Sequence, residues 1–210
     1  MDHLDAIIAG TWVTIQLAIF SFIGAAAFGL LVGICRISPV PSLRIAGTVY
    51  VEGLRSMPIT VLMVFFYFGL PDVKVSLSAF ACAVLGLGLY GGAYIAEAIR
   101  SGVNAIPAGQ IEAGRAIGLT QGQLLRDIVL PQAARTVVAP MGNVFVDLVK
   151  NTSIAYTISV VEITGTATNL VSRYAKPVET FVAAGLAYLI LTIPLGIYFR
   201  NLESRKAIKR

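Results

Sequence analysis

Charge is scarce in this sequence. Only 13% of its 210 residues are Asp, Glu, Lys or Arg, whereas a soluble domain carries about 25%. The mean hydropathy is +0.81 and 57% of the residues are hydrophobic, which is more apolar surface than a water-exposed globule can bury. The sparse charge also excludes an intrinsically disordered chain. The composition therefore predicts an all-α polytopic membrane protein.

Residues that carry chemistry are also few. The two cysteines, Cys35 and Cys82, lie inside apolar stretches, which excludes an extracellular disulfide scaffold. His3 is the only histidine, so we expect no metal site. No Ser or Cys stands beside a plausible base, so we expect no catalytic residue. Because a Gly-rich phosphate loop ending in Gly-Lys-Ser/Thr is missing, we expect the chain to bind no ATP or other cofactor itself.

Five stretches are long enough to cross a bilayer, which takes about 20 apolar residues in a helix. They are residues 6–35, 52–70, 75–97, 136–162 and 178–199 of a single membrane domain, residues 1–210. The second begins at the membrane boundary if Glu52 and Arg55, three residues apart, share one helix face. The fourth contains Asp147, Lys150 and the polar run Asn151-Thr152-Ser153, which are costly at membrane depth.

The basic residues predict the orientation. With the N-terminus outside, the inner segments hold eleven Lys or Arg residues: Arg36, Arg44, Arg100, Arg115, Arg126, Arg135, Arg200, Arg205, Lys206, Lys209 and Arg210. The outer segments hold three: Lys74, Arg173 and Lys176. Because cytoplasmic segments are enriched in Lys and Arg, we expect the N-terminus outside and the C-terminus in the cytoplasm. This topology explains the net charge of +5 without a nucleic-acid partner, and membrane lipid is the expected surroundings.

The inner segment between the third and fourth spans, residues 98–135, is expected to be folded, since it is neither Pro/Gly-rich nor highly charged. Pro107 can open a helix over residues 108–117. Gly118 fits the left-handed residue that ends such a helix.

A second short helix is expected directly after it. Thr120 and Gln123, three residues apart, have the capping-box arrangement of a helix start. We expect this helix to run to about Leu130, where Pro131 limits its continuation. The two helices would form a hairpin beneath the inner face of the membrane.

The hairpin carries a recognisable spacing of residues. It reads Glu112-Ala113-Gly114, three residues, Gly118, nine residues, Ile128, one residue, Leu130-Pro131. This resembles the signature loop of bacterial ABC importer permeases: Glu-Ala-Ala, three residues, Gly, nine residues, Ile, any residue, Leu-Pro. The one departure is Gly114 for the second Ala, which loosens the first helix by about 1 kcal/mol of propensity. Leu54–Pro58, Glu97–Gly102 and Lys150–Ser153 extend the resemblance to the polar amino-acid branch, and Leu191–Gly196 to actinobacterial glutamate-uptake permeases.

The resemblance implies a type I (MetI-like) permease fold with about five transmembrane helices and a cytoplasmic coupling helix, in the bacterial plasma membrane. Two separate ATPase subunits would bind ATP and Mg and dock on the hairpin, where the small Ala113 and Gly114 permit close approach. The residues assigned to this coupling are Glu112, Ala113, Gly114, Arg115, Gly118, Leu119, Leu130 and Pro131. An external binding protein would deliver glutamate, aspartate or glutamine. A second permease, favoured as a homologous but different chain, would complete the pathway.

Polar groups of the fourth span are the expected substrate pathway. Asn151-Thr152-Ser153 can interrupt the helix, and the freed N–H groups would hold a substrate carboxylate. Glu162 is the first choice to accept the substrate ammonium and Asp147 the second, with Lys150 as counter-ion for a side-chain carboxylate. Alternatively, these groups stabilise the permease dimer or its gate. Further pathway candidates are Arg55, Tyr94 and Glu97, although Glu97 can instead pair with Arg100 to support the loop.

Two other functions fit the same charges. An ion-coupled secondary carrier or channel would use Asp147, Lys150 and Glu162 as a charge relay and would not need the hairpin. An assembly scaffold would be indifferent to loss of charge at Glu162 and Lys150. Deletion of residues 108–131 separates the first of these from an ABC permease, because uptake is lost only if the hairpin transmits work from an ATPase.

Overall fold

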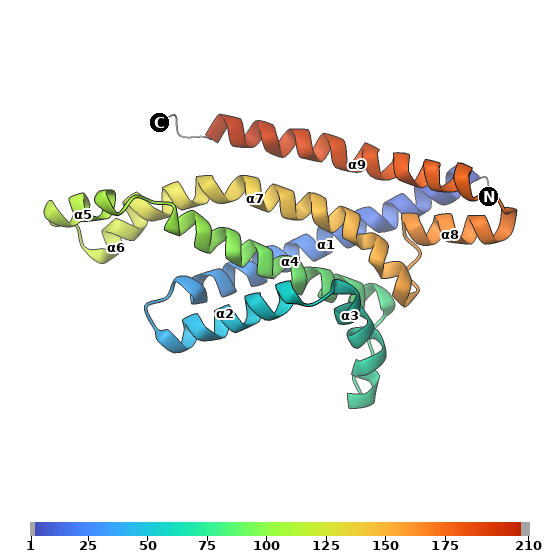
Figure 1. Cartoon of the computed structure of the whole chain (residues 1–210), viewed down its shortest axis with the longest axis horizontal. Helices are drawn as coiled ribbons and strands as arrows, with labels where there is room; N and C mark the ends of the chain where they lie inside the picture. The colour runs from blue at the N-terminus through green and yellow to red at the C-terminus, as the bar shows by residue number, and fades with distance from the viewer. Residues whose placement is uncertain (1–2, 207–210) are drawn as a thin grey trace.

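Three long apolar helices form the body of the protein (Figure 1). The computed structural model describes residues 3–206, and the side chains as far as Leu202. The three helices are α1 (His3–Ile37), α4 (Ala79–Asn104) and α9 (Pro177–Lys206). Each is long and apolar enough to cross a membrane, and two bent pairs of helices raise the number of possible spans to five. No strand occurs among residues 3–206, in agreement with the predicted all-α class.

The first bent pair corrects the predicted span at residues 52–70. Helix α2 (Pro41–Ser56) ends inside this predicted span, and the next helical segment, Ile59–Val73, is inclined at 103° to it. This segment comprises α3 (Ile59–Val64), a π-helical turn and a 3₁₀ turn. We attribute the break to Pro58, because a proline disfavours the helical conformation of the residue before it. Met57 accordingly has φ −97° and ψ 137°.

The second bent pair contains the predicted fourth span. Its first arm, Gln121–Ile158, is continuous from α6 (Gln121–Gln123) through α7 (Leu130–Asn151). The second arm is α8 (Ile163–Tyr174), inclined at 49° to the first. Ser159 permits the bend, since its φ of 69° is left-handed and cannot continue a right-handed helix.

Pro131 does not end the second hairpin helix, contrary to the prediction. The chain forms a π-helical turn over Leu124–Val129 and passes directly into α7, with Pro131 in its first turn. A proline removes one backbone donor and its ring collides with the carbonyl four residues earlier. The wider π turn, whose hydrogen bonds run from residue i+5 to residue i, accommodates both effects. Leu130 N–H donates in this way to the Leu125 carbonyl.

Helix α4 lies at the centre of the packing, between α1 on one side and α7 on the other. Glycines on α4 allow α1 to approach closely: a Cβ added at Gly92 would lie 3.4 Å from the backbone nitrogen of Gly29. Fully buried Leu17, Leu87 and Leu148 join the three helices in one apolar core.

The molecule is elongated, and different helix termini lie at its two ends (Figure 1). The beginning of α1 lies with α8 at one end, whereas α6 and α5 (Ala108–Ala116) lie at the other, together with the end of α9. Lys209 and Arg210, counted above among the inner basic residues, fall outside the described residues.

Candidate functional site

The hairpin begins with a short, exposed helix. In α5, all residues except Ile111 and Gly114 are exposed to solvent, including Glu112, Ala113 and Arg115. The residue that follows it, Ile117, is 79% exposed. A nine-residue helix with so little buried surface is marginal on its own. It therefore presents a surface that a partner can cover.

Two predicted turn features of the hairpin are confirmed. Gly118 has a φ of +87°, and Leu119 N–H donates to the Gly114 carbonyl, as at a glycine-terminated helix end. The Thr120 hydroxyl accepts from the Gln123 N–H while the Gln123 side chain accepts from the Thr120 N–H, which completes the capping box.

Gly114 does not lie on the surface of α5 that faces outward. It is buried, and a Cβ at this position would lie 2.5 Å from Leu124 Cδ2 and 3.0 Å from Ile128 Cδ1. The close approach that a small residue permits here is therefore to the chain's own following helix. This corrects the expectation that Gly114, like Ala113, offers room to a partner.

A polar contact joins the hairpin to α7. The Gln132 side-chain amide donates to Gln110 Oε1 at 2.6 Å and to the Ile128 carbonyl at 3.0 Å. Leu130 and Pro131, beside it, are exposed. Helix α7, which has Pro140 inside it, runs from this contact to Asn151 and so connects α5 with the polar residues at its far end.

Those polar residues line a cavity between α4 and α7. The cavity has a volume of about 310 Å³, and its lining includes Tyr90, Tyr94, Asp147, Lys150 and Asn151. Lys150 Nζ lies 2.7 Å from Asp147 Oδ1, and both side chains remain more than half exposed. The Tyr90 and Tyr94 hydroxyls lie 3.0 Å apart. The predicted pathway residues Tyr94, Asp147, Lys150 and Asn151 are thus brought together.

A second cavity lies on the other side of the same ion pair. It measures about 480 Å³ between α7 and α9, and its lining includes Asn143, Asp147, Lys150, Phe199 and Arg200. The sequence interpretation assigned no pathway role to Asn143 or Arg200. The sequence does contain a signal for Asn143. Asn143, Asp147 and Lys150 are spaced four and three residues apart, so they share one helix face.

Thr152 and Ser153 have a different role from the one predicted. The α-helix does end at Asn151, as expected, but a 3₁₀ turn (Thr152–Ile158) follows directly. Thr152 is buried and donates to the Val149 carbonyl, and Ser153 donates to the Lys150 carbonyl. The hydroxyls thus bind back to the helix end, and no helix N-terminus opens here for a substrate carboxylate.

Glu162 is also not in the polar cavity. It is 0% exposed and caps α8, where its carboxylate accepts from the backbone N–H groups of Thr164 and Gly165. The Tyr188 hydroxyl of α9 donates to Glu162 Oε2 at 2.6 Å. Helix N-termini favour such a carboxylate. With these partners, Glu162 joins α8 to α9 and does not line the cavity that holds Asp147 and Lys150.

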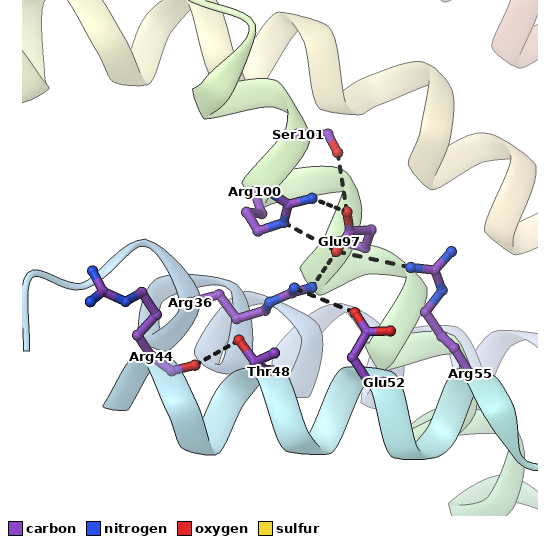
Figure 2. Close-up of polar contacts among 8 residues, drawn as sticks. All are labelled: Arg36, Arg44, Thr48, Glu52, Arg55, Glu97, Arg100 and Ser101. Atoms are coloured by element: carbon purple, nitrogen blue, oxygen red, sulfur yellow. Dashed lines mark hydrogen bonds and ion pairs between the residues drawn. The ribbon is translucent and has the colours of Figure 1, made fainter. Parts of the chain in front are cut away.

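Glu97 is the centre of an ion cluster (Figure 2). Its carboxylate binds Arg36 of α1 and Arg100 of its own helix, and it lies 4.0 Å from Arg55 of α2. The predicted Glu97–Arg100 pair is present. Arg36, counted above only as a topology charge, is 7% exposed and also lies 3.7 Å from Glu52. Glu97 therefore holds three helices together and is not part of the cavity.

Arg55 connects this cluster with the cavity. Its guanidinium carbon lies 5.2 Å from the centre of the Tyr94 ring, within cation–π range. Because Arg36 and Arg100 already bind Glu97 more closely, Arg55 is the most loosely held cation of the cluster. It lies beside the cavity, of which Tyr94 forms one wall.

Comparison with known proteins identifies the class. The chain belongs to the family described as binding-protein-dependent transport system inner membrane component, which matches residues 7–208. Members of this family are multi-pass inner-membrane subunits without catalytic activity, and their partners are a separate ATPase, which handles ATP, and a substrate-binding protein. This finding contradicts the alternatives of an ion-coupled carrier and a scaffold.

Curated relatives are similar over nearly the whole chain. The glutamate transport system permease protein GluC of Corynebacterium glutamicum is 36% identical, with 100% of this chain and 97% of that protein covered. The "Probable glutamine ABC transporter permease protein GlnM" of Bacillus subtilis is 35% identical over 97% and 94%. The octopine transport system permease protein OccM of Rhizobium radiobacter is 39% identical over 94% and 84%.

Solved structures show the same fold. A crystal structure of an amino acid ABC transporter with histidines superposes with a TM-score of 0.91 and 26% identity, covering 98% of this chain and 99% of that chain. A chain of the MetNI methionine ABC transporter superposes with a TM-score of 0.80 and 20% identity, covering 99% and 100%. The predicted MetI-like permease fold is confirmed.

Proposed function

We propose that this chain forms half of an ATP-driven pathway that imports an amino acid, with glutamate, aspartate or glutamine as the favoured substrates. The observation that carries the proposal is the cavity of about 310 Å³ in which Asp147 and Lys150 face the Tyr90–Tyr94 pair. Its volume falls within the range of about 300–1,000 Å³ for small-molecule sites. Charged groups at membrane depth are costly and mark transport pathways. The names of the glutamate and glutamine relatives support the substrate.

An amino acid needs both charges that this cavity offers. Asp147 can accept from the substrate ammonium, the role first expected of Glu162, and Lys150 can bind a carboxylate. The side chains of Asp147 and Lys150 are both more than half exposed, so a ligand can reach them. Arg55, held loosely beside Tyr94, offers a second cation for an acidic side chain.

The hairpin couples this cavity to the ATPase. Glu112, Ala113 and Arg115 on the open side of α5 are proposed to contact the ATPase, whereas Gly114, Gly118 and Leu119 shape the turn behind them. Closure of two ATPases would move α5, and the Gln110–Gln132 contact would carry this motion into α7. The pathway would then open alternately to the two sides.

A second permease completes the pathway. Asn143, Asp147 and Lys150 form a polar stripe that the chain's own helices leave exposed, and lipid is a poor cover for such a stripe. A homologous, non-identical chain is the favoured partner. Mass spectrometry of the complex purified through this chain tests this directly: a second permease sequence supports the proposal, and this chain alone contradicts it.

The N-terminus is proposed to lie outside the cell and the C-terminus in the cytoplasm. The end of α1, whose last turn holds Arg36, lies toward the end of the molecule that carries α5, whereas α8, whose last turn holds Arg173, lies at the other end. This division follows the positive-inside rule.

Uptake by the reconstituted complex tests the substrate. Proteoliposomes containing the permeases, the ATPase and the binding protein are supplied with radiolabelled Glu, Asp, Gln, Arg or His. The proposal predicts that one of the first three is taken up fastest, and that Lys150→Gln slows uptake of glutamate about tenfold more than uptake of glutamine. Fastest transport of Arg or His would contradict it, because Lys150 would repel a cationic side chain.

A charge swap distinguishes substrate contact from a purely structural role. If Asp147 and Lys150 only stabilise the dimer or its gate, Asp147→Lys with Lys150→Asp keeps their ion pair and preserves uptake. If the two residues contact the substrate, the swapped complex assembles normally and transports poorly. Size-exclusion chromatography of the complex provides the assembly control.

A further inference from the structure

We propose that the cavity between α7 and α9 is a second, cytoplasm-side subsite in which Arg200 binds the side-chain carboxylate of an acidic amino acid leaving the pathway. The proposal rests on the proposed function, since it assumes that an amino acid passes the Asp147–Lys150 pair. It assigns a ligand contact to Arg200 and Asn143, and both residues lie outside the first cavity.

The position of the second cavity supports this role. The two cavities share Asp147 and Lys150, which form a partition between them. The first extends toward α4, and the second extends toward Gly196, Phe199 and Arg200 in the last turns of α9. Those turns lie at the end of the molecule that also carries α5 and α6 (Figure 1). A ligand that moves from the first cavity to the second therefore moves toward the ATPase-facing end.

The charges of the second cavity select an anion. Asp147 lies 2.7 Å from Lys150, so these two groups largely neutralise each other. Arg200 is a second, exposed cation on the cavity wall, so the lining holds two cations, Lys150 and Arg200, and one carboxylate, Asp147. Asn143 adds an amide that can donate to or accept from a ligand.

The size and openness of the cavity suit a transient subsite. Its volume of about 480 Å³ exceeds that of the first cavity, and four of its polar lining residues are solvent-exposed: Asn143, Asp147, Lys150 and Arg200. Exposed cations bind anions weakly. Weak binding is what release requires, because a tightly held amino acid would remain on the protein.

Equilibrium binding to the intact complex tests the proposal. The nucleotide-free complex, without binding protein, is placed in nanodiscs of zwitterionic lipid, and binding of radiolabelled L-glutamate and L-glutamine is measured by dialysis. The two probes differ chiefly in the charge of the side chain. We expect Arg200→Gln to weaken glutamate binding about tenfold and glutamine binding less than twofold. Arg135→Gln is the matched control, since Arg135 is an exposed arginine of α7 that lines neither cavity.

Each outcome has a distinct meaning. Unchanged glutamate affinity in Arg200→Gln overturns the subsite, and so does an equal loss for both probes. If native mass spectrometry shows that Arg200→Gln releases a bound anionic phospholipid while glutamate binding persists, the cavity is a lipid headgroup site and the proposal is also wrong. Failure of the wild-type complex to take up any amino acid would instead overturn the proposed function.

Discussion

Glu97 binds or closely approaches arginines of three different helices, α1, α2 and its own helix α4. Its closest partner on α1, Arg36, is almost completely buried, so the cluster stabilises the fold only while the carboxylate is present. Removing one partner of a buried pair leaves the other charge uncompensated, which costs about 3–5 kcal/mol. Among single residues, Glu97 therefore contributes most to holding α1, α2 and α4 together.

We therefore predict that Glu97→Gln destabilises the protein by about 3 kcal/mol, since the buried Arg36 loses its close counter-ion and keeps only the exposed Glu52, 3.7 Å away. The matched control is Glu52→Gln. Glu52 is 62% exposed and 3.7 Å from the same arginine, so its loss costs less than about 1 kcal/mol. Thermal unfolding in detergent measures both. Equal effects of the two substitutions would contradict the account of the cluster.

Gly114 gives a second prediction at this scale. Gly114→Leu forces side-chain atoms between α5 and Leu124, and such overpacking costs about 1–3 kcal/mol and displaces the helix. ATP-driven uptake is expected to fall sharply at normal membrane abundance. Gly109→Ala is the control, because nothing lies within 4 Å of its Cβ position. Uptake that tolerates Gly114→Leu as well as Gly109→Ala would show that the packing beneath α5 is unimportant for coupling.

At the scale of elements, the hairpin was largely predictable from sequence because its signals are local. Gly118 at the helix end and the Thr120–Gln123 box act within a few residues of themselves. Pro131 was misread, because the same residue ends a helix in one context and lies in the first turn of a continuing helix in another. The π turn that permits the second outcome has no strong sequence signal.

Contacts between residues far apart in the sequence could not be predicted. Glu162 looked like a pathway carboxylate because nothing near it in sequence reveals the approach of Tyr188, 26 residues away. Arg36 and Glu97 are 61 residues apart, so their pairing could not be read from spacing. By contrast, Asp147 and Lys150 are three residues apart on one helix, a spacing from which their ion pair can be expected.

Substitution of Pro131 tests the cause of the π turn. Pro131→Ala restores a backbone donor and removes the ring, so residues 124–131 can adopt ordinary α-helical hydrogen bonds. We expect slower amide hydrogen exchange in this segment and no loss of stability. Hydrogen-exchange mass spectrometry of the complex checks this, with residues 136–151 of α7 as the internal reference. Exchange that is unchanged at 124–131 would mean that Pro131 does not cause the π turn.

At the scale of the whole molecule, the proposed orientation places α5 in the cytoplasm and Lys74 outside. In a background with Cys35→Ser and Cys82→Ser, we predict that Lys74→Cys reacts with a membrane-impermeant maleimide in intact cells. Ile117→Cys, on the exposed end of α5, should react only after the cells are permeabilised. Both labelling sites are exposed, so accessibility differs only through the membrane. The reverse pattern would invert the topology and place the hairpin beyond the reach of an ATPase.

The central claim is that this subunit moves solute only with work delivered from outside itself through α5. The most direct measurement is uptake of the preferred amino acid into proteoliposomes of the assembled complex, with and without ATP on the ATPase side. A matched complex lacks residues 108–131. We predict concentrative uptake only in the intact complex with ATP. Accumulation without nucleotide, or undiminished accumulation by the complex lacking the hairpin, would contradict the account.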